Sequence, residues 1–159
     1  LIAVVHWGIE YATTPNQKQK EMADFLFRHG VDYIIGGHPH VLQPMELRGQ
    51  DPYRQQFVLY SLGNFISNQR KRHTGGLMLS LTLVKEGERT RLLPPQYTLT
   101  WVHLYEKEGK KHYKIRPCTP EEENDPDMSA KDLKQMKIFV EDSRKLFKTH
   151  NKGTIIEKK

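Results

Sequence analysis

The sequence has a single cysteine and no long hydrophobic run, and each scarcity excludes a class of protein. Among its 159 residues Cys118 stands alone, which excludes an internal disulfide framework and a multi-cysteine zinc module. No stretch approaches the roughly 20 consecutive apolar residues of a membrane-spanning helix, so we expect no transmembrane segment in this chain. The first residues also lack the features of a secretory signal peptide.

Length and hydrophobic content favour a single domain with one core, and the charge favours an anionic partner. Hydrophobic residues make up 36% of the chain, enough for a single domain core. The formal net charge of +6 favours phosphate, an acidic polymer or an anionic surface as a partner, although a solvated basic face explains most of the lysines. We expect no specific nucleic acid as a partner. Because the chain starts directly inside an apolar run, we interpret it as a fragment whose upstream part is missing.

The first 35 residues have the pattern of a strand, a helix and a second strand. Residues 1–5 and 31–35 are short apolar runs, as in strands buried on both faces. Between them Thr14 is the predicted N-cap of a helix that Gly30 ends. This βαβ unit predicts two parallel strands. The predicted inward stripe of the helix consists of Met22, Phe25 and Leu26.

The chain then turns to mainly antiparallel β structure. Strands are predicted at 41–47, 55–62 and 76–84, and a further alternation runs from Tyr97 to Tyr105. Gly109 marks a hairpin turn that leads into a strand at 112–116. The pattern predicts an α/β fold of the layered α+β kind that closes with a C-terminal helix.

Four regions follow from this pattern. Residues 1–116 form the main domain, 117–128 an acidic linker, 129–150 an amphipathic helix capped by Ser129, and 151–159 a basic tail.

Two histidine clusters directly follow the first two predicted strands. His6 comes after the first strand, and His38 and His40 flank Pro39 after the second. Ligands of open α/β sheets bind at the carboxyl ends of the strands, and parallel pairing brings these two ends to the same edge. We therefore expect the three imidazoles to lie together, although they are far apart in the sequence.

These residue types are suited to transition metals. Neutral imidazole is a common ligand of zinc, iron and manganese, and two metals a few ångströms apart can activate a water. Gly36 and Gly37 let the backbone approach a metal or a bound oxyanion closely. Three imidazoles lack the negative charge that such a site needs, and Glu10 is the nearest carboxylate. Taken alone, His6 is more commonly a structural residue, and Glu10 can equally be a local cap.

A third segment ends the strand at 55–62 and is followed by positive charge. Asn64 can hydrogen-bond a substrate or order the turn. The basic cluster that includes Arg70 and Arg72 can recognise an anionic substrate, although most such clusters are only solvated. The other histidines lack companions, and we interpret them as surface or structural residues: His29, His73, His103, His112 and His150.

Three motifs in order resemble the CapA family of capsule-synthesis proteins, which is associated with poly-γ-glutamate. The motifs are His6-Trp7-Gly8-Ile9-Glu10-Tyr11, Gly37-His38-Pro39-His40 and Tyr60-Ser61-Leu62-Gly63-Asn64-Phe65. The resemblance covers roughly residues 1–84. It implies the C-terminal half of a calcineurin-like metallophosphoesterase domain, an αββα sandwich.

The resemblance also implies roles for individual residues. His6, His38 and His40 would be metal ligands, and Glu10 and Asn64, which fall in the family motifs, are the candidate catalytic residues. Gly36, Gly37, Arg70 and Arg72 are the candidate substrate-binding residues on the chemical grounds given above. The intact domain would hold two divalent ions of manganese, iron or zinc. The early motifs of that fold are absent here, so the upstream half of the domain is an expected partner and this chain alone is expected to be inactive.

Function remains open between two classes. The first is a metal-dependent hydrolase of a phosphoester or a γ-glutamyl amide. The resemblance alone implies a location at the cell envelope, outside the cytoplasm. The second is a non-catalytic component of a polymer synthesis or export assembly that binds polyanions through the 70–72 cluster. A structural zinc held by the three histidines is a third reading, but it lacks a fourth ligand.

Overall fold

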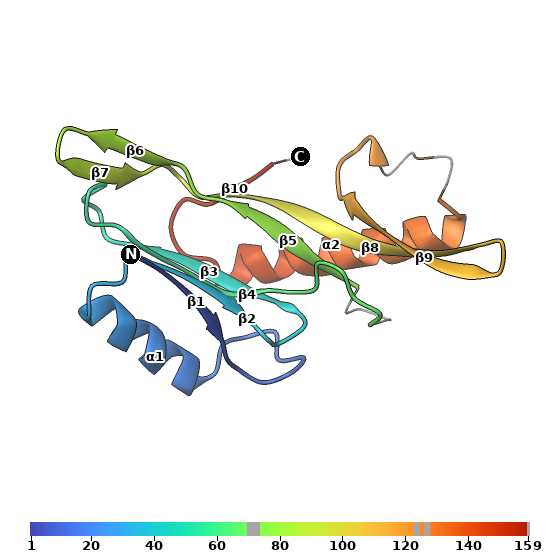
Figure 1. Cartoon of the computed structure of the whole chain (residues 1–159), viewed down its shortest axis with the longest axis horizontal. Helices are drawn as coiled ribbons and strands as arrows, with labels where there is room; N and C mark the ends of the chain where they lie inside the picture. The colour runs from blue at the N-terminus through green and yellow to red at the C-terminus, as the bar shows by residue number, and fades with distance from the viewer. Residues whose placement is uncertain (70–73, 123–124, 126–127, 159) are drawn as a thin grey trace.

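The computed structural model describes residues 1–69, 74–122, 125 and 128–158 (Figure 1). The predicted basic residues Arg70 and Arg72 lie outside this set. The elements, in chain order, are β1 (Ile2–His6), α1 (Gln17–Arg28), β2 (Tyr33–Gly37), β3 (Leu42–Arg48), β4 (Gln56–Leu62), β5 (Gly75–Ser80), β6 (Leu83–Glu86), β7 (Arg89–Leu92), β8 (Gln96–Lys107), β9 (Lys110–Pro117), α2 (Ala130–His150) and β10 (Ile156–Glu157).

The N-terminal third forms a four-stranded sheet in the order β1-β2-β4-β3. β1 pairs parallel with β2 and β2 pairs parallel with β4, whereas β3 runs antiparallel to β4. Each residue from Ile2 to His6 has its partner between Tyr33 and Gly37. The predicted βαβ unit with parallel strands is therefore confirmed.

Helix α1 covers one face of this sheet, but not with the predicted residues. Its buried side chains are Gln19, Ala23 and Phe27, whereas Met22 and Phe25 are each 49% exposed. The expected inward stripe was wrong for Met22 and Phe25 and right for Leu26, which packs against the cluster between α1 and the sheet. Packing on the sheet selects a face that contains one polar and one small residue.

The start of α1 also differs from the prediction. The N-cap is Asn16, whose side chain accepts a hydrogen bond from the backbone N–H of Gln19. The Gln19 side chain in turn accepts from the N–H of Asn16, which completes a capping box two residues after the predicted one at Thr14.

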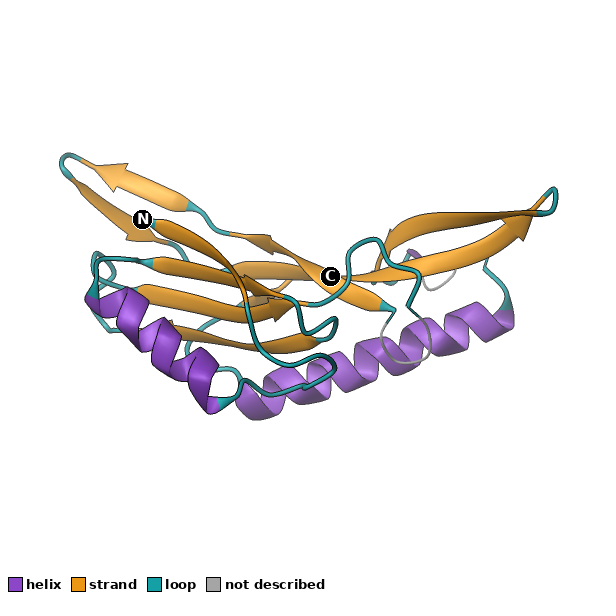
Figure 2. Cartoon of the chain, turned by 60° about the horizontal axis from the view of Figure 1, so that its bottom comes forward, coloured by secondary structure: helices purple, strands orange, loops and turns teal. Residues whose placement is uncertain are grey.

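The other face of the first sheet packs against a second sheet and α2. The second sheet has the order β10-β8-β5, with β9 paired to β8. Alternation on β4 separates the two cores, because Val58 and Tyr60 face α1 while Phe57 and Leu59 join Met136 and Phe139 of α2. Figure 2 shows α1 and α2 as two separate helices that lie along the sheets. The predicted layered α+β fold is therefore confirmed.

Two hairpins extend from the body at opposite ends of the molecule (Figure 1). One is β6–β7, and it interrupts the single strand that was predicted at 76–84. β5 ends at Ser80, and Leu83 at the start of β6 is 45% exposed. The other is the β8–β9 hairpin predicted around Gly109, and its position is confirmed.

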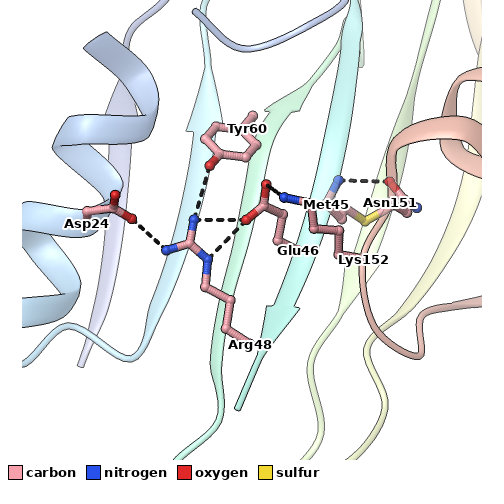
Figure 3. Close-up of polar contacts among 7 residues, drawn as sticks. All are labelled: Asp24, Met45, Glu46, Arg48, Tyr60, Asn151 and Lys152. Carbon is pink, nitrogen blue, oxygen red and sulfur yellow. Dashed lines mark hydrogen bonds and ion pairs between the residues drawn. The ribbon is translucent and has the colours of Figure 1, made fainter. Parts of the chain in front are cut away.

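The residues that follow α2 attach to both sheets. Asn151 Oδ1 accepts a hydrogen bond from the backbone N–H of Met45 at 2.8 Å, and Lys152 exchanges backbone hydrogen bonds with β3 (Figure 3). Further on, β10 pairs parallel with β8, and Glu157 forms an ion pair with Arg144 at 2.7 Å. The C-terminal residues therefore hold the two layers together.

A polar network beside β3 connects this attachment to α1 (Figure 3). The guanidinium of Arg48 donates to Asp24 at 2.6 Å and to Glu46 at 2.8 and 3.0 Å, and Lys152 reaches the other oxygen of Glu46 at 3.2 Å. Burial, together with the nearby Glu46 carboxylate, raises the pKa of Tyr60 to about 12, so its phenol stays neutral beside Arg48. Glu46 is only 8% exposed, and its charge is balanced by two cations.

The segment predicted as an acidic linker contributes to the core at both of its ends. Cys118 and Met128 are buried in the main hydrophobic cluster. The buried Arg116 forms ion pairs with Glu122 and Asp125. Ser129 is the N-cap of α2, as predicted. The division into four regions stays a prediction.

Strand β1 forms an edge of the first sheet with an uncovered apolar face. Val4 is 81% exposed and Ile2 is 51% exposed. No described helix is both long and apolar enough to span a membrane.

Candidate functional site

The two histidine loops meet at one edge of the first sheet. His6 ends β1 opposite Gly37, and the ring centroids of His6 and His38 are 4.4 Å apart. The His38 and His40 rings follow at 6.2 Å. The predicted convergence of the three imidazoles is confirmed, because parallel pairing aligns the ends of β1 and β2.

Backbone contacts hold the two loops against each other. The N–H of Trp7 donates to the carbonyl of Gly37 at 3.1 Å, and the N–H of Tyr11 donates to the carbonyl of Pro39 at 2.7 Å. These bonds continue the β1–β2 pairing into the loops. The distance between the histidines is therefore set by backbone geometry rather than by the side chains alone.

The loops contain unusual backbone conformations. His38 has a φ of 101°, His40 of 60° and Tyr11 of 64°. Residues with a Cβ rarely adopt positive φ, and each such residue costs about 1–3 kcal/mol. Strained residues of this kind concentrate at functional sites, because the surrounding structure must over-determine them.

Asn64 holds His40 through two hydrogen bonds. Its Nδ2 donates to the carbonyl of His40 at 2.9 Å, which leaves Oδ1 facing Nδ1 of the His40 ring at 3.0 Å. Because Oδ1 only accepts, Nδ1 carries a proton in this arrangement, and in the neutral ring Nε2 then keeps its lone pair. A histidine ligand of a metal is commonly oriented in this way by its second nitrogen.

Glu10 lies on the solvent side of the same ring. Its Oε1 is 3.8 Å from Nε2 of His40, and its side chain is 53% exposed. The lone pair of His40 and the Glu10 carboxylate therefore face the same accessible space. The structure brings together five of the predicted site residues: His6, His38, His40, Glu10 and Asn64.

The two predicted glycines have different surroundings. A Cβ on Gly36 would lie 2.2 Å from the carbonyl oxygen of Tyr60 and 2.4 Å from Nε1 of Trp7, so the absence of a side chain here serves packing. Trp7 Nε1 also donates to that carbonyl at 2.8 Å. Gly37 has nothing within 4 Å of a Cβ position, so its backbone is open to approach.

Two buried glutamines shape the loop that presents Glu10, and sequence reasoning missed both. Gln43 is fully buried and donates to the carbonyls of Ala12 and Thr14 at 2.8 and 3.2 Å. Gln19 donates to Oε1 of Gln43 at 2.8 Å. The sequence offers one signal, which is that Gln43 interrupts an apolar strand pattern. That signal does not identify the backbone carbonyls to which the side chain donates.

The donor types suit a transition metal, but the set in this chain is incomplete. Imidazole nitrogens and a carboxylate are ligands that zinc, iron and manganese accept. Among residues 1–69, 74–122, 125 and 128–158, no group of three His, Cys, Asp or Glu side chains has a geometry that could hold a metal ion. The three histidines and Glu10 thus have donor types that are compatible with a transition metal, but the described residues by themselves form no metal site.

Residues 1–69 match the family described as bacterial capsule synthesis protein PGA_cap. The matched segment contains all three motifs, and the match supports the resemblance to the CapA family. The chain is 44% identical over 64 residues to the PGA biosynthesis protein CapA of Bacillus subtilis (strain 168). It is 41% identical over 69 residues to the capsule biosynthesis protein CapA of Bacillus anthracis.

These similarities cover 40% and 43% of this chain. The matched segment spans 16% of the length of each of the two relatives. Residues 70–159 lie beyond the family match, and they contain the second sheet and α2. The description of these elements therefore rests on the structure.

Proposed function

We propose that this segment contributes to the metal site of a CapA-type hydrolase that acts in the synthesis of capsule or poly-γ-glutamate polymer at the cell envelope, outside the cytoplasm. The observation that carries the proposal is the convergence of His6, His38 and His40, with a ring separation of 4.4 Å between the first two. The names of the two relatives, both concerned with capsule or PGA biosynthesis, support the polymer role.

In this proposal the three histidines are ligands of manganese, iron or zinc. The missing donors come from outside this chain, in the upstream half of the same domain. When bound, a pair of such ions supplies an activated water and polarises a phosphoryl or carbonyl oxygen. The positive charge and the polymer-related relatives favour an anionic substrate, either a phosphoester or a γ-glutamyl amide.

Two neighbouring residues have separate tasks. Asn64 is a positioning residue, because its two bonds fix the His40 ring with Nε2 available. Glu10 is a candidate proton acceptor, since its carboxylate is exposed and lies 3.8 Å from that nitrogen. The strained backbone at His38 and His40 supports a functional rather than a packing role for this loop.

The reaction is tested with the full-length protein that the gene encodes. Hydrolysis of an aryl phosphoester and of a γ-glutamyl anilide is measured with manganese or zinc, for the wild type and for His38→Ala/His40→Ala. We expect one substrate to be cleaved and the double variant to lose about 100-fold or more of that activity. Equal activity of the two proteins would exclude these histidines from the reaction.

The non-catalytic alternative keeps the polymer role without hydrolysis. It was based on the basic residues at 70–72, which lie outside the described residues. A full-length protein that binds anionic polymer but neither holds metal nor cleaves either substrate would favour this alternative.

A further inference from the structure

The β8–β9 hairpin extends from the body at one end of the molecule (Figure 1). Its register gathers lysines on one of its two faces. The register places Lys107 opposite Lys110, Tyr105 opposite His112, and His103 opposite Lys114. Alternation puts these six residues on one face of the hairpin. We call the three lysines and the rings of Tyr105 and His112 the lysine face.

Charge is distributed unequally between the two faces. On the opposite face Lys111 is paired with Glu106, so that charge is balanced across the strands. On the lysine face two lysines stand directly opposite each other, and no ion pair joins Lys107, Lys110 or Lys114 to a carboxylate of the described residues. At the base of the hairpin, the nearby acids Glu122 and Asp125 are bound to Arg116, and the Asp132 carboxylate lies 3.5 Å from Nε2 of His103.

The opposed lysines have an energetic cost that packing does not explain. Like charges directly opposite in an antiparallel pair destabilise it. Both residues are exposed at the turn, where many polar residues would satisfy the backbone equally well. The turn itself is well defined, since Glu108 and Gly109 have φ of 54° and 72°. A bound anion would relieve this repulsion.

The rings between the lysines provide a flat surface. Tyr105 and His112 stack at 5.3 Å with 17° between their planes, and Tyr105 is 37% exposed. At their base lies an open cavity of about 350 Å³, lined by His103, Tyr105, Glu106, Lys107, Lys114 and Arg116. Alternate residues of a strand are about 7 Å apart, so Lys110 and Lys114 lie about 14 Å apart with the stacked rings between them.

We propose that the lysine face binds a linear polymer that carries carboxylates, with the chain lying along β9. The carboxylates pair with the three lysines, and the aliphatic part of the polymer contacts the stacked rings. A single-stranded nucleic acid fits less well, because its bases need open aromatic faces and Tyr105 is already stacked on His112. The surface lies outside the family match at residues 1–69, and the proposal does not depend on metal chemistry at the histidines.

The test measures binding of fluorescently labelled poly-L-glutamate to this chain by anisotropy, at low and physiological ionic strength. The hairpin variant is Lys107→Gln/Lys110→Gln/Lys114→Gln. The matched control is Lys18→Gln/Lys20→Gln/Lys85→Gln, which removes three exposed lysines of α1 and β6. Its net charge equals that of the hairpin variant. Circular dichroism and the melting temperature establish that both variants are folded.

We expect the wild type to bind, with weaker binding at higher salt. The hairpin variant is expected to bind about tenfold more weakly than the control, since each exposed ion pair contributes about 0.2–1 kcal/mol. Equal weakening in both variants would reduce the interaction to net charge and overturn the proposal. No binding by the wild type at low salt, or tighter binding of single-stranded DNA than of poly-L-glutamate, would overturn it as well.

Discussion

Replacing Asn64 by alanine tests whether this residue holds the histidine loop in place. The side chain makes two hydrogen bonds to His40, at 2.9 and 3.0 Å, and the residue is only 6% exposed. Each bond contributes about 1 kcal/mol to stability, so we expect the free energy of unfolding to fall by about 2 kcal/mol. For a chain of this length the melting temperature should fall by roughly 4–8 °C.

The assay is urea denaturation followed by tryptophan fluorescence, because Trp7 stacks on Tyr60 beside the site at 5.8 Å. Asn68→Ala is the control, since it is the same substitution in the same loop at an exposed position, where it removes one solvent-exposed hydrogen bond from the Tyr113 hydroxyl at 2.9 Å. We expect the control to change stability by less than about 0.5 kcal/mol. If Asn64→Ala is no less stable than this control, the two bonds do not hold His40 and the positioning role is wrong.

Two further predictions concern pH and association. Burial lowers the pKa of His103, with smaller contributions from Arg116 and Lys114, although Asp132 opposes the shift. The stability that this residue contributes is therefore complete above the unfolded-state pKa of about 6.5, and it is lost as the pH falls toward the folded-state pKa. Urea midpoints at a series of pH values should show this loss in the wild type and a smaller loss in His103→Gln; equal losses would refute it. The uncovered β1 edge is expected to make the chain self-associate, and Val4→Lys should shift the sedimentation profile toward the monomer. A monodisperse wild-type monomer that melts cooperatively would contradict this expectation.

The sequence predicts the position of the histidines well because one local pattern determines it. Two apolar runs joined by a helix specify parallel strands, and parallel strands bring their carboxyl ends together. His6 and His38 follow those ends directly, so their meeting at 4.4 Å requires no knowledge of the rest of the molecule. The β8–β9 hairpin is equally local, since Gly109 and the alternation on both sides define it.

Features that depend on distant partners could not be predicted. The buried face of α1 includes Gln19, whose side-chain amide is satisfied at both ends, by the N–H of Asn16 and by Oε1 of Gln43 in β3. Hydrophobicity alone therefore favoured the exposed Met22 and Phe25. The bond between Asn64 and His40 joins two loops that lie 24 residues apart in the sequence. The break after Ser80 likewise reflects where the second sheet ends rather than any turn residue.

The central claim is that the histidines at the sheet edge are metal ligands, and metal content tests it most directly. The full-length protein that the gene encodes is loaded with manganese or zinc, dialysed and measured by elemental analysis. His38→Ala/His40→Ala is compared with His29→Ala/His112→Ala, which removes two exposed histidines outside the cluster. We predict one or two equivalents of metal in the wild type and the control, and a loss in the cluster variant. A wild type without metal, or a cluster variant that retains it, would contradict the claim.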